Sequence, residues 1–511
     1  MGGLHADDST LACWRAHDPA IESAAHLLEE LTEGSLPQAF AAGAQSHPQS
    51  TLAVGDDEYT LAELLETAGR WASALVADGV VAGRPVILRA APSGAWLCAY
   101  LGLLTVGAPI VLASSALTAP EFRVIVDSSG AELAITDGAA PGGIPQVALA
   151  SLANAARSSS PTTGSGPDAG DVALIAFTSG TTGAPKGVPL THSMLLSSIR
   201  GVMRAWRWSA DDRLVHALPL YHQHGLGAIH ATLIAGSSAR VLATFDPRTL
   251  VDTIRTERAT VLFAVPTIYQ RLVDLPGNVA AELASLRLAT SGSAPLSEAL
   301  FERIQERLGL TPVERYGLTE SGLDVSNLYD GPRRPGVVGY PLPGVEMRLA
   351  DAEGRDVAPG DDGEIVLRGP QVFSGYLNDP DATKQAFFND NWFRTGDLGQ
   401  ITGDGALIIT GRRKEIIVSG GMNVSPREVE EVLAGHPAVK EAAVAGLPDP
   451  YWGEAVAAWV VLRSDIDSAE LTAYCRERLM SFKCPKKITL VDSLPRTSMG
   501  KVQRNQLKSL V

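Results

Sequence analysis

The sequence has few cysteines and no closely spaced pair of them. Among its 511 residues the four cysteines, Cys13, Cys98, Cys475 and Cys484, lie far apart with no CxxC spacing. A zinc ribbon needs paired ligands, and a disulfide framework needs many cysteines in a short chain. Both are therefore excluded, and the cysteine usage fits a reducing compartment, so we expect a cytoplasmic protein.

Basic residues are also in deficit. The chain has 42 Lys and Arg against 57 Asp and Glu, a net charge of -15. Such an acidic surface disfavours nucleic acid and anionic lipid as main partners. The opening decapeptide, "MGGLHADDST", contains acidic residues and no apolar core, which is unlike a signal or basic transit peptide. We expect small-molecule partners and a monomer or weak homodimer.

Long uncharged runs are limited to one stretch that requires a membrane test. The run from Trp96 to Leu117 carries no charge and is long enough to span a bilayer. Gly107, Ala108 and Pro109 interrupt it in the middle, and no basic flank follows. The interruption predicts a buried helix, a turn and then a buried strand, instead of a membrane span.

The sequence is rich in short apolar runs that alternate with helical patterns. Continuous runs such as "RPVILRAA", "VALIAFTSG" and "ATVLFAVP" are typical of strands covered on both faces. A helical stretch opens with a capping box formed by Thr60 and Glu63. The alternation predicts α/β layers with mostly parallel sheets, and the length predicts more than one domain.

A domain boundary is predicted near the stretch "GRRKEIIVSGGMNVSPREVEEVL". A short strand leads there through a glycine turn into a helix with Ser425 as N-cap, Pro426 as its first residue and Glu428 at the third position. Enough chain remains after it for a small α+β domain. We expect an N-terminal domain over 1–413 and a C-terminal domain over 414–511.

The strongest chemical motif is "FTSGTTGAPKG", from Phe177 to Gly187. A buried strand runs into a loop of serine, threonine and glycine that ends in Lys186. Glycines let backbone N–H groups approach phosphate oxygens, while the hydroxyls and the lysine add donors and charge. It differs from a Walker A loop because glycine follows Lys186. A phosphate-binding loop is favoured over a merely flexible one.

This motif resembles the phosphate loop of the acyl-adenylate-forming family, which includes acyl-CoA synthetases, peptide-synthetase adenylation domains and luciferases. Four later motifs resemble that family in the same order: "YGLTE", "RTGDLG", "GRRKEIIVSGG" and "PRTSMGKV". The resemblance runs from about residue 35 to the end. It implies a large N-terminal α/β domain with a small β-barrel-like subdomain, followed by a mobile α+β lid domain.

The resemblance implies a site for ATP and Mg²⁺. It assigns the phosphates to Thr178, Ser179, Gly180, Thr181, Thr182, Gly183 and Lys186. It assigns the rest of the nucleotide to Ser293, Ala294, Pro295, Glu314, Arg315, Tyr316, Gly317, Leu318, Thr319, Asp397 and Arg412. Glu320 and Thr181 would hold Mg²⁺, Thr319 would lie near the α-phosphate, and Lys501 would bridge the acyl carboxylate and that phosphate.

The resemblance also implies the rest of the site. Lys414 would be the hinge of the lid domain, and Ser419, Gly420 and Gly421 would border the channel for the thiol of CoA. The acyl pocket would be lined by His222, Gln223, His224, Ser291, Gly292, Arg315 and Leu318. His222 is also expected to take part in catalysis, although a buried structural histidine is an equal reading.

Arg315 in "VERYGLTESG" indicates which kind of acid would be the substrate. A buried unpaired guanidinium costs about 3–5 kcal/mol, so an anion should meet it. Glu314 is its neighbour on an extended segment and should point the other way. A second carboxylate of a short dicarboxylic acid is the better partner. Arg334 is a second candidate anion contact, although a loop role is favoured for it.

Several segments resemble malonyl-CoA (methylmalonyl-CoA) synthetases closely, among them "LPLYHQHGL", "SGSAPL", "ERYGLTE" and "LPRTSMGKVQ". Leu318 stands where methionine is common there, and Gln223 where a small hydroxyl residue is common, which leaves the preferred C2 substituent open. We expect ligation of malonate or a C2-substituted malonate to CoA through an acyl-adenylate, with release of AMP and pyrophosphate. The alternatives are a short-chain monocarboxylate CoA ligase, an enzyme that loads a carrier protein, and a non-catalytic binding protein.

Overall fold

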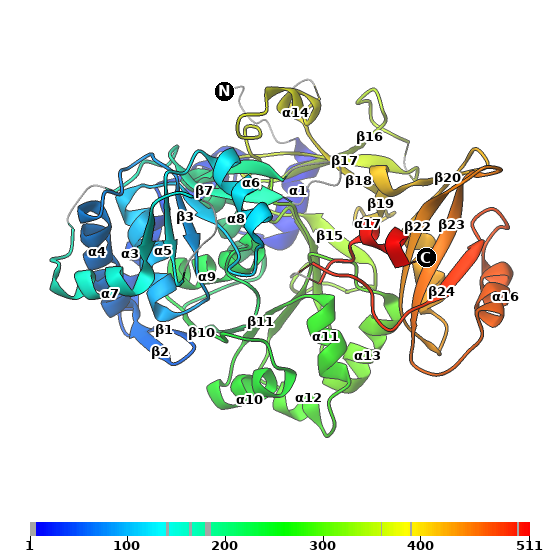
Figure 1. Cartoon of the computed structure of the whole chain (residues 1–511), viewed down its shortest axis with the longest axis horizontal. Helices are drawn as coiled ribbons and strands as arrows, with labels where there is room; N and C mark the ends of the chain where they lie inside the picture. The colour runs from blue at the N-terminus through cyan, green and yellow to red at the C-terminus, as the bar shows by residue number, and fades with distance from the viewer. Residues whose placement is uncertain are drawn as a thin grey trace.

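The described residues form three β-sheets (Figure 1). The computed structural model describes residues 7–138, 143–162, 166–178, 185–358, 360–388, 391–497 and 500–510. Within these ranges, none of the helices is both long and apolar enough to cross a membrane. The mixed α/β fold expected from the alternating pattern is confirmed.

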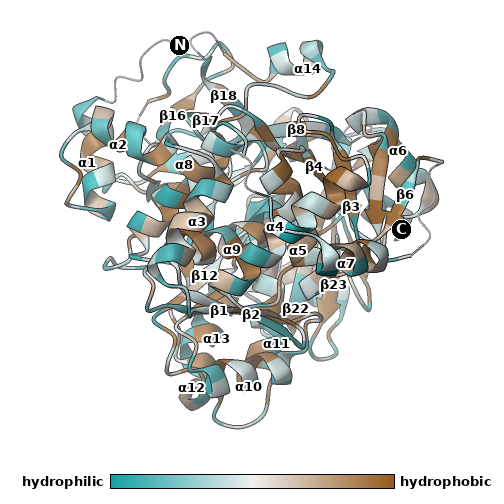
Figure 2. Ribbon diagram, turned by 90° about the vertical axis from the view of Figure 1, so that its left-hand side faces the viewer, coloured by the Kyte–Doolittle hydropathy of each residue, from teal (hydrophilic) through white to brown (hydrophobic). Residues whose placement is uncertain are grey.

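The first sheet has six strands in the order β6-β5-β3-β4-β7-β8, and it is parallel except for the pair β7–β8. Figure 2 shows β3 and β4 as brown, apolar ribbons that lie among helices. The uncharged run forms α5 (Gly94–Val106), a turn and β4, as predicted. The strands are β3 (Val86–Arg89), β4 (Ile110–Leu112), β5 (Leu133–Thr136), β6 (Gln146–Ala148), β7 (Val172–Thr178) and β8 (Lys186–Thr191).

The second sheet has thirteen strands, and its two halves differ in direction. One half is parallel, in the order β13-β12-β11-β9-β10-β1, with β2 antiparallel at its edge. Its strands are β1 (Thr51–Val54), β2 (Asp57–Thr60), β9 (Arg213–His216), β10 (Ser238–Val241), β11 (Val261–Ala264), β12 (Leu288–Ser291) and β13 (Val313–Tyr316).

The other half of this sheet is antiparallel and continues directly from β13 through β14 and β15 to β19, β18, β17 and β16. It holds the strands expected for the small subdomain, in one sheet with the parallel half. They are β14 (Val325–Ser326), β15 (Val337–Pro341), β16 (Glu346–Ala350), β17 (Gly363–Arg368), β18 (Phe393–Ile401) and β19 (Leu407–Arg412).

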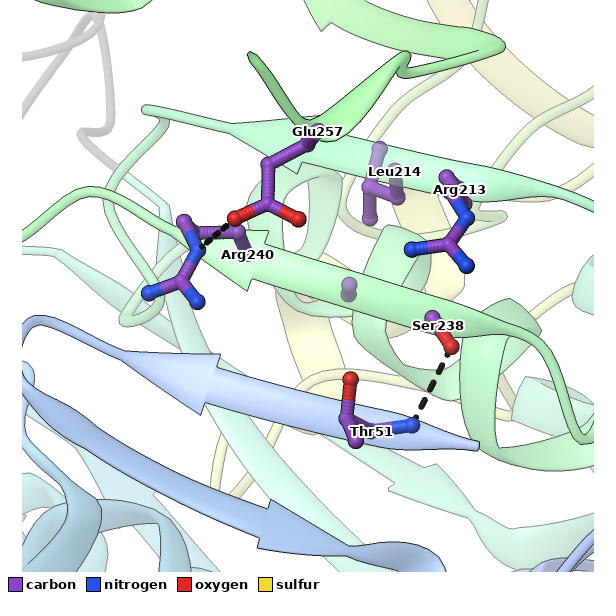
Figure 3. Close-up of a pocket in the computed structure, with 7 residues that line it drawn as sticks. Thr51, Arg213, Leu214, Ser238, Arg240 and Glu257 are labelled. Carbon is purple, nitrogen blue, oxygen red and sulfur yellow. Dashed lines mark hydrogen bonds and ion pairs between the residues drawn. The ribbon is translucent and has the colours of Figure 1, made fainter. Parts of the chain in front are cut away.

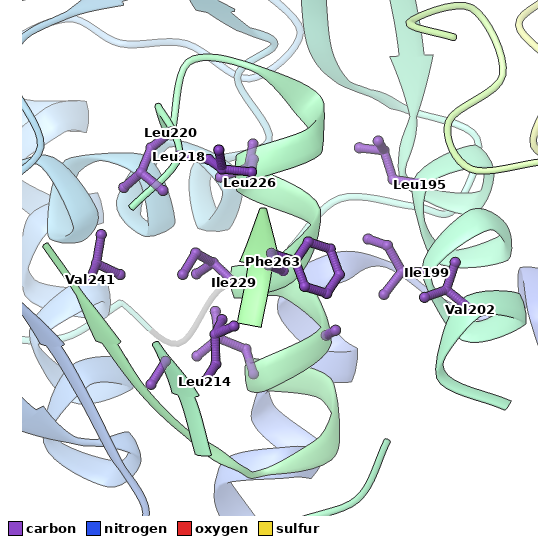
Figure 4. Packing of buried hydrophobic residues seen from close by; sticks show 14 of the residues in the cluster. Leu195, Ile199, Val202, Leu214, Leu218, Leu220, Leu226, Ile229, Val241 and Phe263 are labelled. Atoms are coloured by element: carbon purple, nitrogen blue, oxygen red, sulfur yellow. The ribbon is translucent and has the colours of Figure 1, made fainter. Parts of the chain in front are cut away.

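Helices α8 (His192–Ala205) and α9 (Gln223–Ala235) cover the parallel half of the second sheet. Figure 4 shows Phe263 of β11 between Ile199 of α8 and Ile229 of α9. All three side chains are buried. Burying one such side chain contributes about 1.5–3 kcal/mol, so this layer helps to hold both helices against the sheet.

The other described helices surround these layers. They are α1 (Asp8–His17), α2 (Ala24–Thr32), α3 (Leu36–Ser46), α4 (Leu61–Ala77), α6 (Ala119–Ser129), α7 (Leu149–Ser158), α10 (Pro247–Glu257), α11 (Pro266–Val273), α12 (Val279–Glu282), α13 (Glu298–Leu308) and α14 (Pro380–Gln385). The capping box predicted for Thr60 and Glu63 opens α4, with both reciprocal hydrogen bonds present.

The third sheet lies in the C-terminal part of the chain and has its own core. It comprises β20 (Ile417–Ser419), β21 (Met422–Val424), β22 (Val439–Asp449), β23 (Gly453–Leu462) and β24 (Lys487–Leu490). Helices α15 (Pro426–Ala434), α16 (Ser468–Arg478) and α17 (Arg504–Leu507) accompany it, and η2 (Arg413–Glu415) connects it to β19. A buried cluster that includes Val429, Val456 and Leu471 joins this sheet to α15 and α16.

The start of α15 lies where the sequence predicts, but its serine bonds differently. Ser425 is the N-cap and Pro426 the first helical residue. The hydroxyl of Ser425 donates to the carbonyl of Thr410 at 2.7 Å instead of capping the helix, and the carboxylate of Glu428 pairs with Lys483. The serine therefore connects α15 to β19.

Helices α3 and α9 cross closely enough to require glycine. A Cβ atom at Gly43 would lie 2.1 Å from the carbonyl oxygen of Leu233. We expect Gly43→Ala to destabilise the protein by about 1–3 kcal/mol, because the helices must separate. Gly227→Ala in α9 is the matched control, since a Cβ there meets nothing within 4 Å and alanine favours helix by about 1 kcal/mol. Thermal unfolding of both variants measures this. Equal melting temperatures would contradict the close crossing.

Candidate active site

The predicted site residues collect at the carboxyl ends of parallel strands. Thr178 ends β7, Ser291 ends β12 and Tyr316 ends β13, while His222 precedes α9 after a short loop from β9. Ligands of α/β sheets bind at this edge because loops there converge on helix starts.

The opposite edge of the second sheet carries a small pocket with paired groups. It lies beside the first residues of β1, β9 and β10. Figure 3 shows Arg240 paired with Glu257, and the backbone N–H of Thr51 donating to the hydroxyl of Ser238. Arg240 is thus already paired with a carboxylate, and the pocket lies at the other edge of the sheet from the predicted site residues.

Three residues predicted for the nucleotide meet between β13, β18 and β19. The hydroxyl of Tyr316 donates to Asp397 at 2.7 Å, and Arg412 pairs with the second oxygen of Asp397 at 2.9 Å. Asp397 and Arg412 stand opposite each other in the two antiparallel strands. Burial and the charge of Asp397 raise the pKa of Tyr316 well above its usual value. Its hydroxyl therefore remains a donor at neutral pH.

The loop after β13 is tightly closed and holds Glu320. A Cβ atom at Gly317 would lie 2.0 Å from the carbonyl oxygen of Gly322, so only glycine fits. Leu318 and Thr319 are half-buried in this loop, and Glu320 is buried. One carboxylate oxygen of Glu320 accepts from the hydroxyl of Tyr376 at 3.0 Å. Burial raises the pKa of Glu320, which is the expected effect on a carboxylate with few compensating charges.

Arg315 is a buried cation without a described anion beside it. Its side chain is 6% exposed, and no described residue accepts from its Nε or Nη2 atoms. Burial lowers the pKa of Arg315 to about 9. A Cβ atom at Gly292 would lie 2.5 Å from its Nε, so glycine is needed there to seat the guanidinium. The packing of β12 against β13 thus leaves a charged group facing the acyl-pocket residues.

Glu314 points away from Arg315, as strand alternation predicts. Its carboxylate accepts from the backbone N–H of Gly336 at 3.1 Å. Burial raises the pKa of Glu314 to about 8, opposed by the charge of Arg427 and reinforced by Glu431. Arg334, the other candidate anion contact, pairs with Asp404 at 2.8 Å where both side chains are about half exposed. This pairing agrees with the loop role favoured for Arg334.

The histidines near Arg315 are held neutral. Burial lowers the pKa of His222 to about 4, helped by the positive charge of Lys501. The pKa of His224 is lowered further by burial and by Arg315. The Nδ1 atom of His224 lies 2.8 Å from the hydroxyl of Ser293, whose φ of 66° is unusual for a residue with a side chain. Gln223, the first residue of α9, is half-buried.

Lys501 reaches this group from the C-terminal part of the chain. Figure 1 shows the red segment before α17 extending toward the centre of the molecule. The side chain of Lys501 is exposed to solvent, yet desolvation and the charges of Arg412 and Arg315 lower its pKa, opposed by the charges of Asp397 and Glu320. Charge–charge influences of this kind extend over roughly 10 Å in salt solution. Lys501 therefore lies among the predicted nucleotide and acyl residues.

Contact with α11 helps to fix the Lys501 loop. Gly500 has a φ of 75°, and a Cβ atom there would lie 2.7 Å from the hydroxyl oxygen of Thr267. The backbone N–H of Lys501 donates to the hydroxyl of Thr497 at 3.2 Å. The loop is thus closed on itself and packed on the N-terminal part of the chain.

The phosphate-loop prediction can be followed only at its ends. Ser179, Gly180, Thr181, Thr182 and Gly183 lie outside the described residues. Thr178 ends β7 and Lys186 begins β8, so the two strands hold the loop at both sides. The Nζ atom of Lys186 lies 4.6 Å from the centre of the Tyr376 ring. Ala294 and Pro295 follow Ser293 in the loop before α13.

The residues predicted for the thiol channel form a separate turn. Gly420 and Gly421 connect β20 to β21 with φ values of 60° and 80°, and Ser419 beside them is buried. The N–H of Gly420 donates to the carbonyl of Trp452 at 2.8 Å. Among the described residues no hydrogen bond or ion pair links this turn to Lys501 or Glu320. Lys414 is exposed on η2.

Two family descriptions match the sequence. "AMP-binding enzyme" matches residues 40–377, and "AMP-binding enzyme C-terminal domain" matches residues 428–501. The chain belongs to the AMP-binding enzyme family. The predicted acyl-adenylate-forming family and an AMP-forming acyl-CoA synthetase are thereby confirmed.

Relatives of this AMP-binding enzyme include several CoA ligases. Feruloyl-CoA synthase of Amycolatopsis sp is 36% identical, with 89% of this chain and 94% of that protein covered. Malonate–CoA ligase ACSF3, mitochondrial, of Homo sapiens is 38% identical, with 66% of this chain and 65% of that protein covered. The crystal structure of ATP-bound MatB from Rhodopseudomonas palustris is 37% identical with a TM-score of 0.88, covering 93% of this chain and 98% of that chain.

Residues outside the sequence motifs of this enzyme hold the Glu320 loop. Asp324 is fully buried and accepts from the hydroxyl of Ser321 at 2.5 Å and from the amide of Gln371 at 3.3 Å. Burial raises the pKa of Asp324 to about 7. Gln371 and Tyr376 belong to "GPQVFSGYL", a segment with no charged residue. Their roles come from contacts with a distant loop, which no local pattern reveals.

Glu314 gives the enzyme a pH-dependent stability. Its pKa rises from 4.5 to about 8 on folding, so the associated stability is complete below about pH 4.5 and is lost as the pH rises through about 8. We expect Glu314→Gln, which keeps an acceptor for Gly336, to reduce this pH-dependent loss of unfolding free energy by on the order of a few kcal/mol. Melting temperatures between about pH 5 and pH 8 test this.

Glu353→Gln is the control for that series, because Glu353 lies on the surface beside Arg355. Its profile should follow that of the unchanged enzyme. A Glu314→Gln profile as steep as the control would contradict the burial of an ionisable carboxyl group.

Proposed function

We propose that the enzyme ligates malonate or a C2-substituted malonate to CoA through an acyl-adenylate, releasing AMP and pyrophosphate. The observation that carries this proposal is the buried guanidinium of Arg315, seated against Gly292 without an acceptor for two of its nitrogens among the described residues. The similarity to a malonate–CoA ligase supports it. Feruloyl-CoA synthase is about as similar, so a monocarboxylate ligase is the alternative.

The acid would bind between two cations. Arg315 would hold the distal carboxylate by charge-assisted hydrogen bonds, and Lys501 would hold the reacting carboxylate together with the α-phosphate. His222 and His224 are neutral at pH 7, so they would contribute hydrogen bonds without adding charge. Gln223 and Leu318 would border the C2 position of the acid. Bringing two anions together requires such fixed positive charge, which acts without reorganisation when its donors are already in position.

The nucleotide would bind along the carboxyl ends of β7 and β13. The ring of Tyr316 would contact the adenine while Asp397 accepts from the ribose hydroxyls beside Arg412. Further contacts would come from the loop residues Ser293, Ala294, Pro295, Glu314, Gly317 and Thr319. Thr178, Lys186 and the intervening loop would hold the β- and γ-phosphates, since their donors follow directly from the end of a strand.

Magnesium would bind at Glu320. Mg²⁺ in such sites is held by one or two carboxylates together with substrate phosphates. Glu320 fits, because its carboxylate is buried and one of its oxygens is oriented by Tyr376. Within the described ranges no three ligating side chains form a separate metal cluster. When bound, the ion would offset phosphate charge. Thr181, the second expected ligand, lies outside the described residues.

The chain would work as two domains, 1–413 and 414–511, that rotate about Lys414. The described arrangement, with Lys501 among the site residues, suits adenylate formation. Rotation would remove Lys501 and bring Ser419, Gly420 and Gly421 to the thiol of CoA, where small residues leave room for its arm. We place the enzyme in the cytoplasm as a monomer or weak homodimer.

Replacing Arg315 tests the acid directly. Each charge-assisted hydrogen bond contributes about 1.5–3 kcal/mol, so Arg315→Met should lower kcat/KM for malonate by about 10²–10⁴-fold. The kcat/KM values for butyrate and acetate should fall much less. The measurement is pyrophosphate release over a panel of malonate, methylmalonate, ethylmalonate, succinate, acetate and butyrate.

Arg334→Met is the matched control, because its guanidinium pairs with Asp404 on the surface. It should leave the acid preference unchanged. Unaltered kcat/KM for malonate in Arg315→Met would overturn the proposed dicarboxylate. A wild-type preference for butyrate would favour the monocarboxylate alternative.

The contact of Gly500 with α11 tests the role of the Lys501 loop. Gly500→Ala should slow adenylate formation by about tenfold or more, because its Cβ would displace the loop from Thr267 and a positive φ costs alanine about 1–2 kcal/mol. Thioester formation from supplied acyl-adenylate should change little.

The double variant Gly500→Ala, Thr267→Ala separates the clash from the backbone strain. It should recover part of the lost rate, since the contacting hydroxyl and methyl are removed. Equal losses in both half-reactions would contradict a loop that serves adenylation alone.

A further inference from the structure

Tyr376 contacts two charged residues that belong to different parts of the site. Its hydroxyl donates to the carboxylate of Glu320 at 3.0 Å, and its ring lies under the Nζ atom of Lys186, 4.6 Å from the ring centre. Glu320 stands in the loop after β13, whereas Lys186 begins β8 in the first sheet. A single side chain therefore spans the proposed metal ligand and the proposed phosphate ligand.

The backbone around Tyr376 is fastened to the same two parts. The N–H of Phe373 donates to the carbonyl of Glu320 at 2.8 Å, and the N–H of Leu377 donates to the carbonyl of Gly187 at 2.8 Å. The N–H of Tyr376 donates to the hydroxyl of Thr383 at 2.9 Å. The segment from Phe373 to Leu377 thus bridges the first sheet and the Glu320 loop, with the tyrosine between the two attachments.

The tyrosine also keeps opposite charges from neutralising each other. Within the described part of the chain, Lys186 and Glu320 form no ion pair, although Tyr376 contacts both. An aromatic face attracts an ammonium group without cancelling its charge, and a hydroxyl donor orients a carboxylate while one of its oxygens stays available. Both groups consequently remain available to a ligand instead of to each other.

We propose that Tyr376 is a positioning residue that holds Lys186 and Glu320 apart and directs both toward one metal–nucleotide complex. This rests on the proposed roles of Glu320 at Mg²⁺ and Lys186 at the phosphates. It requires no particular acid, because the contacts involve only the nucleotide side of the site.

Two variants separate the contribution of the Tyr376 hydroxyl from that of its ring. Tyr376→Phe removes the hydroxyl and keeps the ring, so metal affinity should fall by about ten- to one-hundredfold, as when the outer partner of a metal ligand is lost. ATP binding without metal should stay unchanged. Tyr376→Leu also removes the ring, so metal-free ATP binding should weaken by about 2- to 30-fold, the equivalent of a cation–π contact.

The measurements do not depend on turnover. Binding of Mn²⁺ in the presence of a non-hydrolysable ATP analogue, followed by electron paramagnetic resonance, reports metal affinity. Calorimetric titration with ATP in EDTA reports the metal-free nucleotide. Tyr340→Phe is the matched control, because the Tyr340 hydroxyl lies 3.4 Å from the carboxylate of Asp404 at the surface. Melting temperatures establish that each variant is folded.

The results separate this inference from the proposed function. Wild-type Mn²⁺ affinity in Tyr376→Phe would overturn the role of the hydroxyl, and equal metal-free ATP binding in both variants would overturn the role of the ring. If the wild type binds Mn²⁺ with the analogue but shows no malonate-dependent exchange of pyrophosphate into ATP, the proposed acid is wrong while the inference about Tyr376 stands.

Discussion

The site is organised around a buried guanidinium for which the described residues supply no anion. Leaving the buried charge of Arg315 uncompensated costs about 3–5 kcal/mol. The surrounding described residues accommodate the guanidinium without neutralising it. Gly292 provides the space, and Glu314 turns to the other face of β13 to accept from Gly336. The neighbouring histidines remain neutral at pH 7. Under the proposed function, a substrate carboxylate would compensate the charge, and the cost in the free protein would become selectivity on binding.

The remaining electrostatics agree with a site for anions inside an acidic protein. The chain carries a net charge of -15, yet the charges of Arg315 and Arg412 act together on Lys501 at the site. Asp397 and Glu320 balance this set and are themselves buried. Each carboxylate is oriented by a tyrosine hydroxyl, Tyr316 or Tyr376. Local charge, and not the overall balance, therefore determines which ligands are attracted.

Close approaches of the backbone at two glycines position the loops that carry Glu320 and Lys501. Gly317 closes the loop that holds Glu320, and Gly500 lets the Lys501 loop lie against Thr267. Asp324, Ser321 and Gln371 fix the same Glu320 loop from beneath with buried hydrogen bonds. Because these glycines have no room for a Cβ atom, the positions of both charged side chains depend on glycine at two places far apart in the sequence.

The sequence alone determined the family, the α/β alternation, the turn inside the uncharged run and the direction of Glu314, since these follow from local periodicity and short motifs. Tertiary structure decided the remainder. It placed Tyr376 between Lys186 and Glu320, turned the Ser425 hydroxyl toward Thr410, and left Arg315 without a described acceptor. Each of these depends on contacts between strands and loops distant in the chain, whose geometry no local pattern contains.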